Sequence, residues 1–231
     1  MNGVIDADNR GMNMKERGII FSSEMVRAIL DGRKTQTRRI MKPQPTPCDY
    51  VDERGKARGG HQWPSNIFRT MLHVEGELQN GDGGWKGLVG DACPFGDVED
   101  RIWVRETWQC GLCTESTFAY KATHKPSDLE EGWNEKIKWR PSSQMPRWAS
   151  RILLEITSVR VERLQDISQA DAIAEGAPPS HPTIDAVSRE YGFPDFSRSW
   201  FGQTWWHIYG KENWQANPWV WVIEFKQIQE G

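Results

Sequence analysis

The sequence lacks any apolar run that approaches the length of a membrane span, and its amino end has no hydrophobic core of a signal peptide. We therefore expect a cytoplasmic protein that has no contact with a membrane. The sequence also shows no internal repeat. Its 231 residues are enough for one elaborated domain or two small ones. We expect one, because the motifs described below are spread along the chain.

An overall excess of positive charge is missing as well. The 29 lysines and arginines stand against 32 acidic residues, a net charge of -3, which argues against a protein coated with basic residues. The local balance is different, because Asp31 is the only acidic residue between Arg27 and Lys42. Such a patch can hold a phosphate group while the remaining surface stays acidic. Its six cationic residues are Arg27, Arg33, Lys34, Arg38, Arg39 and Lys42.

Cysteines and histidines are few and poorly spaced for a metal site. Cys110 and Cys113 form a Cys-x-x-Cys pair, with Cys93 upstream and Cys48 further away, but a second such pair is missing. The sequence therefore favours ordinary reduced thiols, with a four-thiolate zinc site as the weaker alternative. The five histidines show no ligand spacing with one another. We expect no metal and no cofactor.

A predicted helix over residues 24–31 leads into the most informative segment, Gly32 to Arg39. Ser22 or Ser23 can cap the helix, apolar residues recur at helical spacing, and Gly32 suits the position after its end. The segment then supplies a lysine and a hydroxyl, Lys34 and Thr37, beside two arginines. Either chemistry or nucleic-acid contact is expected here, although charge runs of this kind are often only exposed turns.

Residues 101–108 alternate as a half-buried strand does. Ile102, Val104 and Glu106 share one face. If that face is buried, Glu106 needs a cationic or hydrogen-bonding partner, and we expect Lys34 to provide it. Such a pair could tune the lysine for proton transfer and leave Thr37 as the activated nucleophile. In the alternative interpretation, Glu106 lies at a strand end and caps a loop.

Together these segments resemble the ASCH domain, a relative of the PUA fold. The resemblance is carried by Gly32, Lys34, Thr37 and Arg39, by a later Gly-Asp, and by the strand Ile-Trp-Val-Arg-Glu-Thr-Trp. It spans about residues 18–228. The segment Met-Pro-Arg-Trp-Ala at 145–149 and the Trp-rich carboxyl end resemble the long type encoded by bacteriophages and prophages.

The resemblance implies an α+β fold with a β-barrel, covering helices and a long loop insertion at about residues 44–90. The spread of the motifs favours a single domain over residues 17–231, and the polar, glycine-containing amino end predicts a disordered leader at residues 1–16. Small bacterial members include an amidohydrolase that removes the acetyl group from N4-acetylcytidine, and its catalytic roles would fall on Lys34, Thr37 and Glu106. Other members are regarded as RNA-binding modules. The resemblance thus leaves two functions open, an amidohydrolase and a non-catalytic module that binds RNA or a modified base.

The expected partner is a nucleoside or a single-stranded nucleic acid, with RNA favoured over DNA, inside a bacterial host cell if the protein is phage-encoded. Aromatic rings can stack on bases, but most of the 13 tryptophans are explained by packing, including those in a predicted helix over 196–209 and in a last strand over 219–225. Trp148 is the exception, since it lies next to an arginine outside any periodic core. The candidate contacts to substrate or nucleic acid are Arg33, Arg38, Arg39, Arg105, Arg147 and Trp148.

Overall fold

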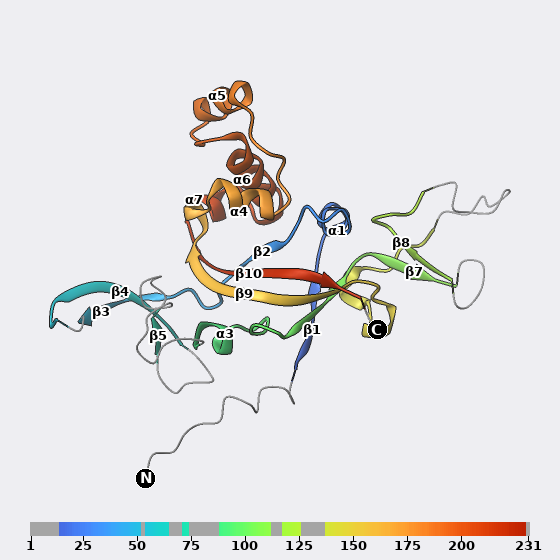
Figure 1. The fold of residues 1–231 in the computed structure, drawn as a ribbon, viewed down its shortest axis with the longest axis horizontal. Helices are drawn as coiled ribbons and strands as arrows, with labels where there is room; N and C mark the ends of the chain where they lie inside the picture. Colours follow the sequence, from blue (N-terminus) through green and yellow to red (C-terminus); the bar gives the residue numbers. More distant parts are fainter. Residues whose placement is uncertain are drawn as a thin grey trace, which may run out of the picture.

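Five strands form the central sheet of the protein (Figure 1). This computed structural model describes residues 14–51, 54–64, 71–73, 88–111, 117–125 and 137–229. The strand pair at one end of the sheet, β1 with β6, is parallel, and the remaining pairs are antiparallel. No closed barrel is detected in these residues, and the fold is mixed α+β. In spatial order the strands are β1 (Glu16–Ile20), β6 (Arg101–Arg105), β9 (Leu153–Arg163), β10 (Trp219–Ile228) and β2 (Gln36–Ile40).

Strand β10 lies inside the sheet, between β9 and β2, and is apolar on both faces, as its run of tryptophan, valine and isoleucine predicts. Trp221 and Ile223 belong to the main core, whereas Val220 and Val222 point to a second core beneath the helices. Because side chains alternate along a strand, one strand thereby holds two hydrophobic layers together. Of the tryptophans expected to pack, Trp205, Trp219 and Trp221 are buried, and Trp200 and Trp206 are half-buried.

The helices α4 to α7 stack on one side of the sheet, above β9 and β10 in Figure 1. They are α4 (Gln169–Ala174), α5 (Pro182–Glu190), α6 (Phe196–Tyr209) and α7 (Lys211–Gln215). The predicted bounds of α6 are confirmed. Helix α5 begins at Pro182, which occupies the first helical position, where its missing N–H costs nothing.

Helix α1 (Ser23–Leu30) confirms the helix predicted over 24–31. Ser22 is its N-cap and accepts a hydrogen bond from the Met25 amide. Gly32 has a φ of 72°, a left-handed conformation that glycine adopts without steric cost, so the chain turns sharply after the helix.

The expected loop insertion at 44–90 is wrong in part, because it contains a sheet of its own, at the left of Figure 1. Its strands are β3 (Thr46–Val51), β4 (Ala57–Pro64) and β5 (Met71–His73), and a short helix, α3 (Leu88–Ala92), follows. The adjacent Gly59 and Gly60 interrupt the period-two pattern of β4 in the sequence. Trp63 ties this sheet to the main core, since its ring meets the Trp221 ring edge-on at 5.3 Å. Most of the predicted leader at residues 1–16 lies outside the described residues, and β1 already begins at Glu16.

A short hairpin at the right of Figure 1 completes the fold: β7 (Trp108–Cys110) paired with β8 (Phe118–Tyr120). The strand predicted over 101–108 is therefore split, with a break at Glu106 and Thr107. The short 3₁₀ helices η3 (Ser142–Gln144), η4 (Arg147–Ala149) and η5 (Leu164–Asp166) connect the elements that follow. Among the described residues, none of the helices is both long and apolar enough to span a bilayer.

Candidate functional site

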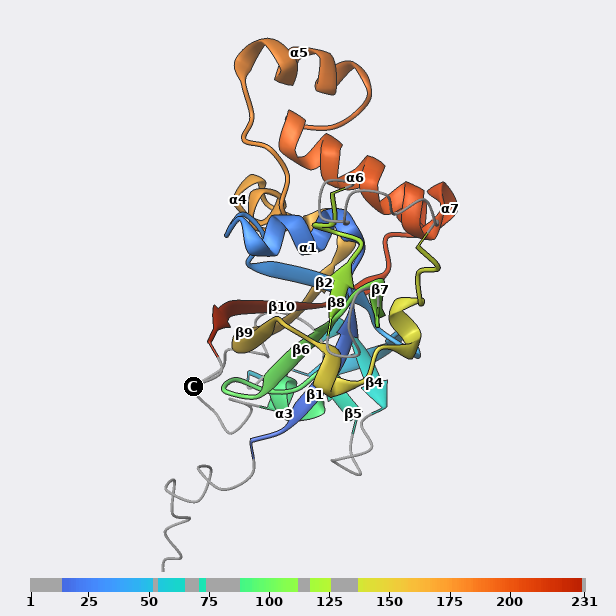
Figure 2. The ribbon, with the colours of Figure 1, turned by 90° about the vertical axis from the view of Figure 1, so that its right-hand side faces the viewer.

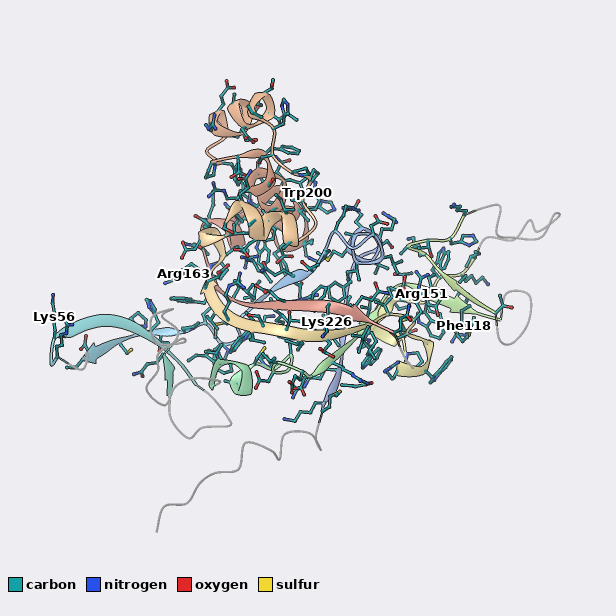
Figure 3. The ribbon with its side chains drawn as sticks, in the orientation of Figure 1. Lys56, Phe118, Arg151, Arg163, Trp200 and Lys226 are labelled. Atoms are coloured by element: carbon teal, nitrogen blue, oxygen red, sulfur yellow. The ribbon has the colours of Figure 1, made fainter. Side chains whose placement is uncertain are left out.

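A cavity of about 890 Å³ lies between α1, the start of β2, the end of α4 and helix α6. Five of the predicted site residues line it: Arg33, Lys34, Thr37, Arg38 and Arg39. Helix α6 contributes aromatic side chains to the opposite wall, among them Trp200, which Figure 3 labels, and Phe201 and Tyr209. A ring system and a charged group can both be accommodated in such a space.

The charge of the lining is predominantly positive. Three acidic side chains, Glu24, Asp31 and Glu175, face six cationic ones, a formal balance of +3. An anionic or electron-rich ligand would therefore be attracted to this cavity. The cationic residues are Arg27, Arg33, Lys34, Arg38, Arg39 and Lys121.

Lys34 forms a deeply buried ion pair in the wall of the cavity. It is only 2 % exposed, and its Nζ donates to Glu175 Oε2 at 2.5 Å and to the Glu175 carbonyl at 2.9 Å. Burial lowers the pKa of Lys34 below its ordinary value, and the charge and hydrogen bond of Glu175 oppose that shift. The pair therefore holds an amine whose protonation is sensitive to what enters the cavity.

The backbone places Lys34 and Glu175 together. The Lys34 amide donates to the Ala28 carbonyl of α1, and the next amide, of Thr35, donates to the Ala174 carbonyl at the end of α4. Gly176 follows with a φ of 104°. A Cβ at Gly176 would lie 3.3 Å from the Ala28 Cβ, so glycine lets α1 and the end of α4 approach closely.

Thr37 lies on β2 and is buried, with its backbone in register with Ile223 of β10. It lines the same cavity as Lys34. Within the described residues, however, no hydrogen bond joins its hydroxyl to Lys34 Nζ, which is occupied by Glu175. The structure thus brings the lysine and the threonine to one cavity, without a formed proton path between them.

Arg38 and Arg39 differ in their roles despite their similar sequence context. Arg38 is 3 % exposed and contacts three carboxylates, with Glu175 Oε1 at 3.3 Å, Asp171 Oδ2 at 3.5 Å and Glu162 closer still. Arg39 donates to the Ile20 carbonyl at 2.9 Å. Arg38 is therefore already neutralised by the protein.

Arg33 is exposed at the rim, where it pairs with Asp31 at 2.9 Å. Such surface pairs exchange readily for a ligand. Arg33 and Arg39 are consequently the better candidates for contact with an anion.

The predicted pairing of Glu106 with Lys34 is wrong. Glu106 is indeed buried, as its alternation with Ile102 and Val104 requires, at 1 % exposure. Its partner is Arg151, whose Nε and Nη2 donate to the two carboxylate oxygens at 2.9 and 3.1 Å. Glu106 does not line the cavity. A bidentate arginine satisfies a carboxylate better than a single ammonium, so Glu106 has no need of Lys34.

The other predicted contact residues, Arg105, Arg147 and Trp148, lie outside the cavity lining. Arg105 donates to the Ser143 carbonyl and covers the Trp103 ring at 5.4 Å. Arg147 pairs with Glu16 at 2.8 Å. Trp148 is 67 % exposed, the large hydrophobic side chain most clearly left to solvent near the β7–β8 hairpin.

Cys93 and Cys110 are free thiols. Cys93 is buried, and this burial raises its pKa to about 12, so its thiol stays protonated. Cys48 and Cys110 are half-buried. No cluster of three or more metal-ligating side chains occurs in the part of the chain that the structure describes. Cys113 lies outside that part.

Comparisons of the chain with models of protein families, with curated proteins and with solved structures find no match. The site must therefore be interpreted from its own geometry.

Glu175 is the functional candidate that the sequence analysis missed. A usable signal exists, because Glu175 ends α4 directly before a left-handed glycine. A carboxylate at the carboxyl end of a helix opposes the helix dipole and calls for a cation nearby. The fold alone decides which cation pairs with Glu175, because Lys34 lies 141 positions away in the sequence.

Proposed function

We propose that this protein is an amidohydrolase that removes an N-acyl group from a modified cytosine, of the kind found in N4-acetylcytidine. One observation carries the proposal: the buried Lys34–Glu175 pair lies in the wall of a cavity that Thr37 also lines. A base, a carboxylate to orient it and a hydroxyl nucleophile are the groups that nucleophilic amide hydrolysis needs. We propose equally that the protein belongs to the ASCH and PUA-like group and has the β-barrel of that group.

The reaction begins with proton transfer. Lys34, in its neutral form, leaves the Glu175 carbonyl, turns toward Thr37 and accepts the hydroxyl proton while the threonine oxygen attacks the acyl carbon. The C–N bond breaks, and the resulting ammonium of Lys34 returns the proton to the leaving amine. Water then hydrolyses the threonine ester, which releases the carboxylic acid and restores the hydroxyl.

The environment of Lys34 suits this role. An amine acts as a base only when it is neutral, and burial lowers the pKa of Lys34. Glu175 keeps the side chain aimed and stabilises the ammonium that forms during the reaction. The positive charge of Arg39 at the cavity wall would stabilise the oxyanion of the tetrahedral intermediate.

A second candidate function is binding without catalysis, in which the cavity holds a modified base or RNA in the bacterial cytoplasm. It is favoured by the fact that Lys34 Nζ hydrogen-bonds Glu175 and, in the described residues, makes no hydrogen bond to the Thr37 hydroxyl. In that case Lys34 and Glu175 contribute to the stability of the fold and to the charge of the cavity, and Thr37 contributes to the shape of the cavity.

The test is release of acetate and cytidine from N4-acetylcytidine, with the variant Thr37→Val beside the natural protein. Valine removes the hydroxyl with little change in volume, so catalysis should be lost while binding of the nucleoside remains. Thr204→Val is the matched control, because Thr204 lines the same cavity from α6. Equal turnover by both variants would exclude Thr37 as nucleophile. No turnover by the natural protein, with binding intact, would favour the second function.

Variants of two buried glutamates test whether Glu175, as the structure suggests, or Glu106, as the sequence predicts, is the carboxylate that assists Lys34. Glu175→Gln should lower kcat on the free nucleoside by roughly 10- to 100-fold, since the lysine loses its orienting charge. Glu106→Gln should leave that kcat nearly unchanged, because Glu106 pairs with Arg151 away from the cavity. The reverse result would restore Glu106 as the catalytic carboxylate. Circular dichroism of both variants confirms that each is folded.

A further inference from the structure

An exposed aromatic surface lies on the β7–β8 hairpin and η4, and it has no role in the reaction just described. Trp148, of η4, is 67 % exposed, and Phe118, of β8, is 38 % exposed. Their rings lie 5.9 Å apart, and both contact the buried ring of Trp108, at 5.8 and 6.5 Å. Phe118 stacks further on Tyr120 at 6.3 Å. We call these four residues the aromatic platform.

The backbone under the platform is tightly fixed, which is unusual for a surface that merely faces water. Met145 and Ala149, on either side of Trp148, are almost fully buried. The Tyr120 hydroxyl donates to the Ala149 carbonyl at 2.9 Å, and the Ser150 hydroxyl donates to the Val104 carbonyl at 2.8 Å. An exposed tryptophan on rigid backbone is pre-organised for a ligand, because little side-chain or loop entropy is lost on binding.

The pair of Glu106 and Arg151 contributes to this rigidity. The Arg151 guanidinium lies 4.0 Å from the centre of the Tyr120 ring while it holds the Glu106 carboxylate. Glu106 also places its amide against the sulfur of Met145 at 3.3 Å. The buried carboxylate predicted to be catalytic is thus part of the support for the platform. Figure 3 shows Arg151 and Phe118 on the same side of the molecule.

The charge around the platform suits a polyanion. Arg140 is exposed and covers the Trp108 ring at 5.2 Å, and no acidic partner of Arg140 occurs among the described residues. Lys121 is exposed as well and follows Tyr120 directly. Aromatic rings for bases and cations for phosphates are the combination by which proteins hold single strands.

The hairpin that carries Phe118 and Tyr120 leads to the cavity wall. Lys121 lines the cavity, and Phe118 is three residues before it, which is roughly 10 Å along an extended chain. Arg27 of α1, another lining residue, donates to the Ala122 carbonyl at 2.9 Å, so the hairpin is docked on the cavity wall. Figure 2 shows β8 running toward α1.

From these observations we infer that the substrate is a base within a single-stranded polynucleotide rather than a free nucleoside: the cavity takes the modified base, and neighbouring bases stack on Trp148 and Phe118. The inference rests on the proposed function for the group held in the cavity. A free nucleoside would need no second surface, whereas a strand that leaves the cavity along β8 meets the platform next.

The experiment compares Trp148→Ala with the natural protein in two assays. The first is fluorescence anisotropy with a short labelled single-stranded RNA that carries no modification. The second is turnover of N4-acetylcytidine, free and within the same RNA. Trp148→Phe tests whether an aromatic ring restores binding, and Tyr191→Ala is the control, because Tyr191 is an exposed aromatic residue elsewhere, after α5.

We expect Trp148→Ala to weaken RNA binding about tenfold, since stacking of one base is worth about that factor. The KM for the modified RNA should rise in parallel, and turnover of the free nucleoside should stay the same. Trp148→Phe should recover most of the binding. Unchanged RNA binding by Trp148→Ala would overturn the inference, and a change in sedimentation would then identify the platform as a protein contact. Absence of turnover by the natural protein with weakened RNA binding by Trp148→Ala would refute the amidohydrolase and retain the platform as a nucleic-acid surface.

Discussion

Lys34 and Glu175 form a buried charge pair whose cost the protein must offset, because both ions lose their hydration. Two hydrogen bonds from one ammonium to one residue, and a second cation, Arg38, on the other carboxylate oxygen, compensate part of that loss. The remaining desolvation lowers the pKa of Lys34. At the scale of single residues, burial thus favours the neutral amine of Lys34, whereas Glu175 favours the ammonium.

The pKa of Lys34 should therefore respond to Glu175 in a definite direction. Burial lowers it and Glu175 raises it, so Glu175→Gln should lower it further. The measurement is a titration of the lysine Cε resonance by NMR, which does not depend on catalysis. In the natural protein, turnover should rise with pH to a plateau reached below the ordinary lysine pKa of 10.5. A Lys34 pKa that stays constant in the variant would show that the two groups are not coupled.

Helix α4 acts as the element that carries Glu175 to the cavity. It is short, only Gln169–Ala174, and a helix of this length depends on its caps and on packing. Ser168 and Asp171 form a capping box at its start. Its end is held by the bond from the Thr35 amide to the Ala174 carbonyl. The position of the carboxylate therefore depends on both ends of one small helix.

Ser168→Ala should lower the free energy of unfolding by about 1 kcal/mol, the usual cost of losing an N-cap. The Ser168 hydroxyl accepts from the Asp171 amide at 3.0 Å, and alanine leaves that amide without its cap. Urea denaturation followed by circular dichroism measures the change. Ser142→Ala is the control, because the 3₁₀ helix at Ser142 has no side-chain cap. A loss of equal size in both variants would contradict the role of the cap.

At the scale of the whole molecule, one ionic network joins the helices to the sheet. Arg38 of β2 and Arg160 of β9 both contact Asp171 of α4, and Arg160 also reaches Glu224 of β10. Strands β9, β10 and β2 are neighbours in the central sheet, and α4 lies above them in Figure 1. The network thus fixes α4 on the sheet that carries Thr37, next to the segment between α1 and β2 in which Lys34 lies.

The stability of the protein should depend on this network in acid. Burial alone would raise the pKa of Asp171, but hydrogen bonds from Gln36 and Ser168 and the charges of Arg38 and Arg160 lower it to about 2. The folded state then binds fewer protons than the unfolded state, in which the pKa is 3.8. The stabilisation from Asp171 is therefore complete above pH 3.8 and is lost as the pH falls toward 2.

Thermal unfolding across this pH range tests the prediction. Asp171→Asn should flatten the fall in melting temperature between pH 3.8 and 2 and lower the melting temperature at neutral pH. Asp49→Asn is the control, because Asp49 is an exposed residue of the separate β3–β5 sheet. An acid profile of Asp171→Asn that matches that of the natural protein would show that the network contributes nothing at this position.

The sequence by itself determined the features that depend on neighbours a few positions apart. The cap and end of α1, the capping box of α4, the bounds of α6 and the burial of Glu106 follow from spacing and alternation. The strands β3 and β4 were not predicted, because a Gly-rich segment shows little periodicity. Their structure depends on strand pairing and on the contact of Trp63 with the core.

Only the tertiary structure decided which buried charges pair. Lys34 meets Glu175 because sheet order places β2 beside β10 and the chain after β9 returns as α4 onto the same region. Glu106 meets Arg151 because η4 and the start of β9 pack against the end of β6. The sequence pattern indicates that a buried carboxylate needs a cationic partner. Which arginine or lysine is that partner depends on distances that only the folded chain fixes.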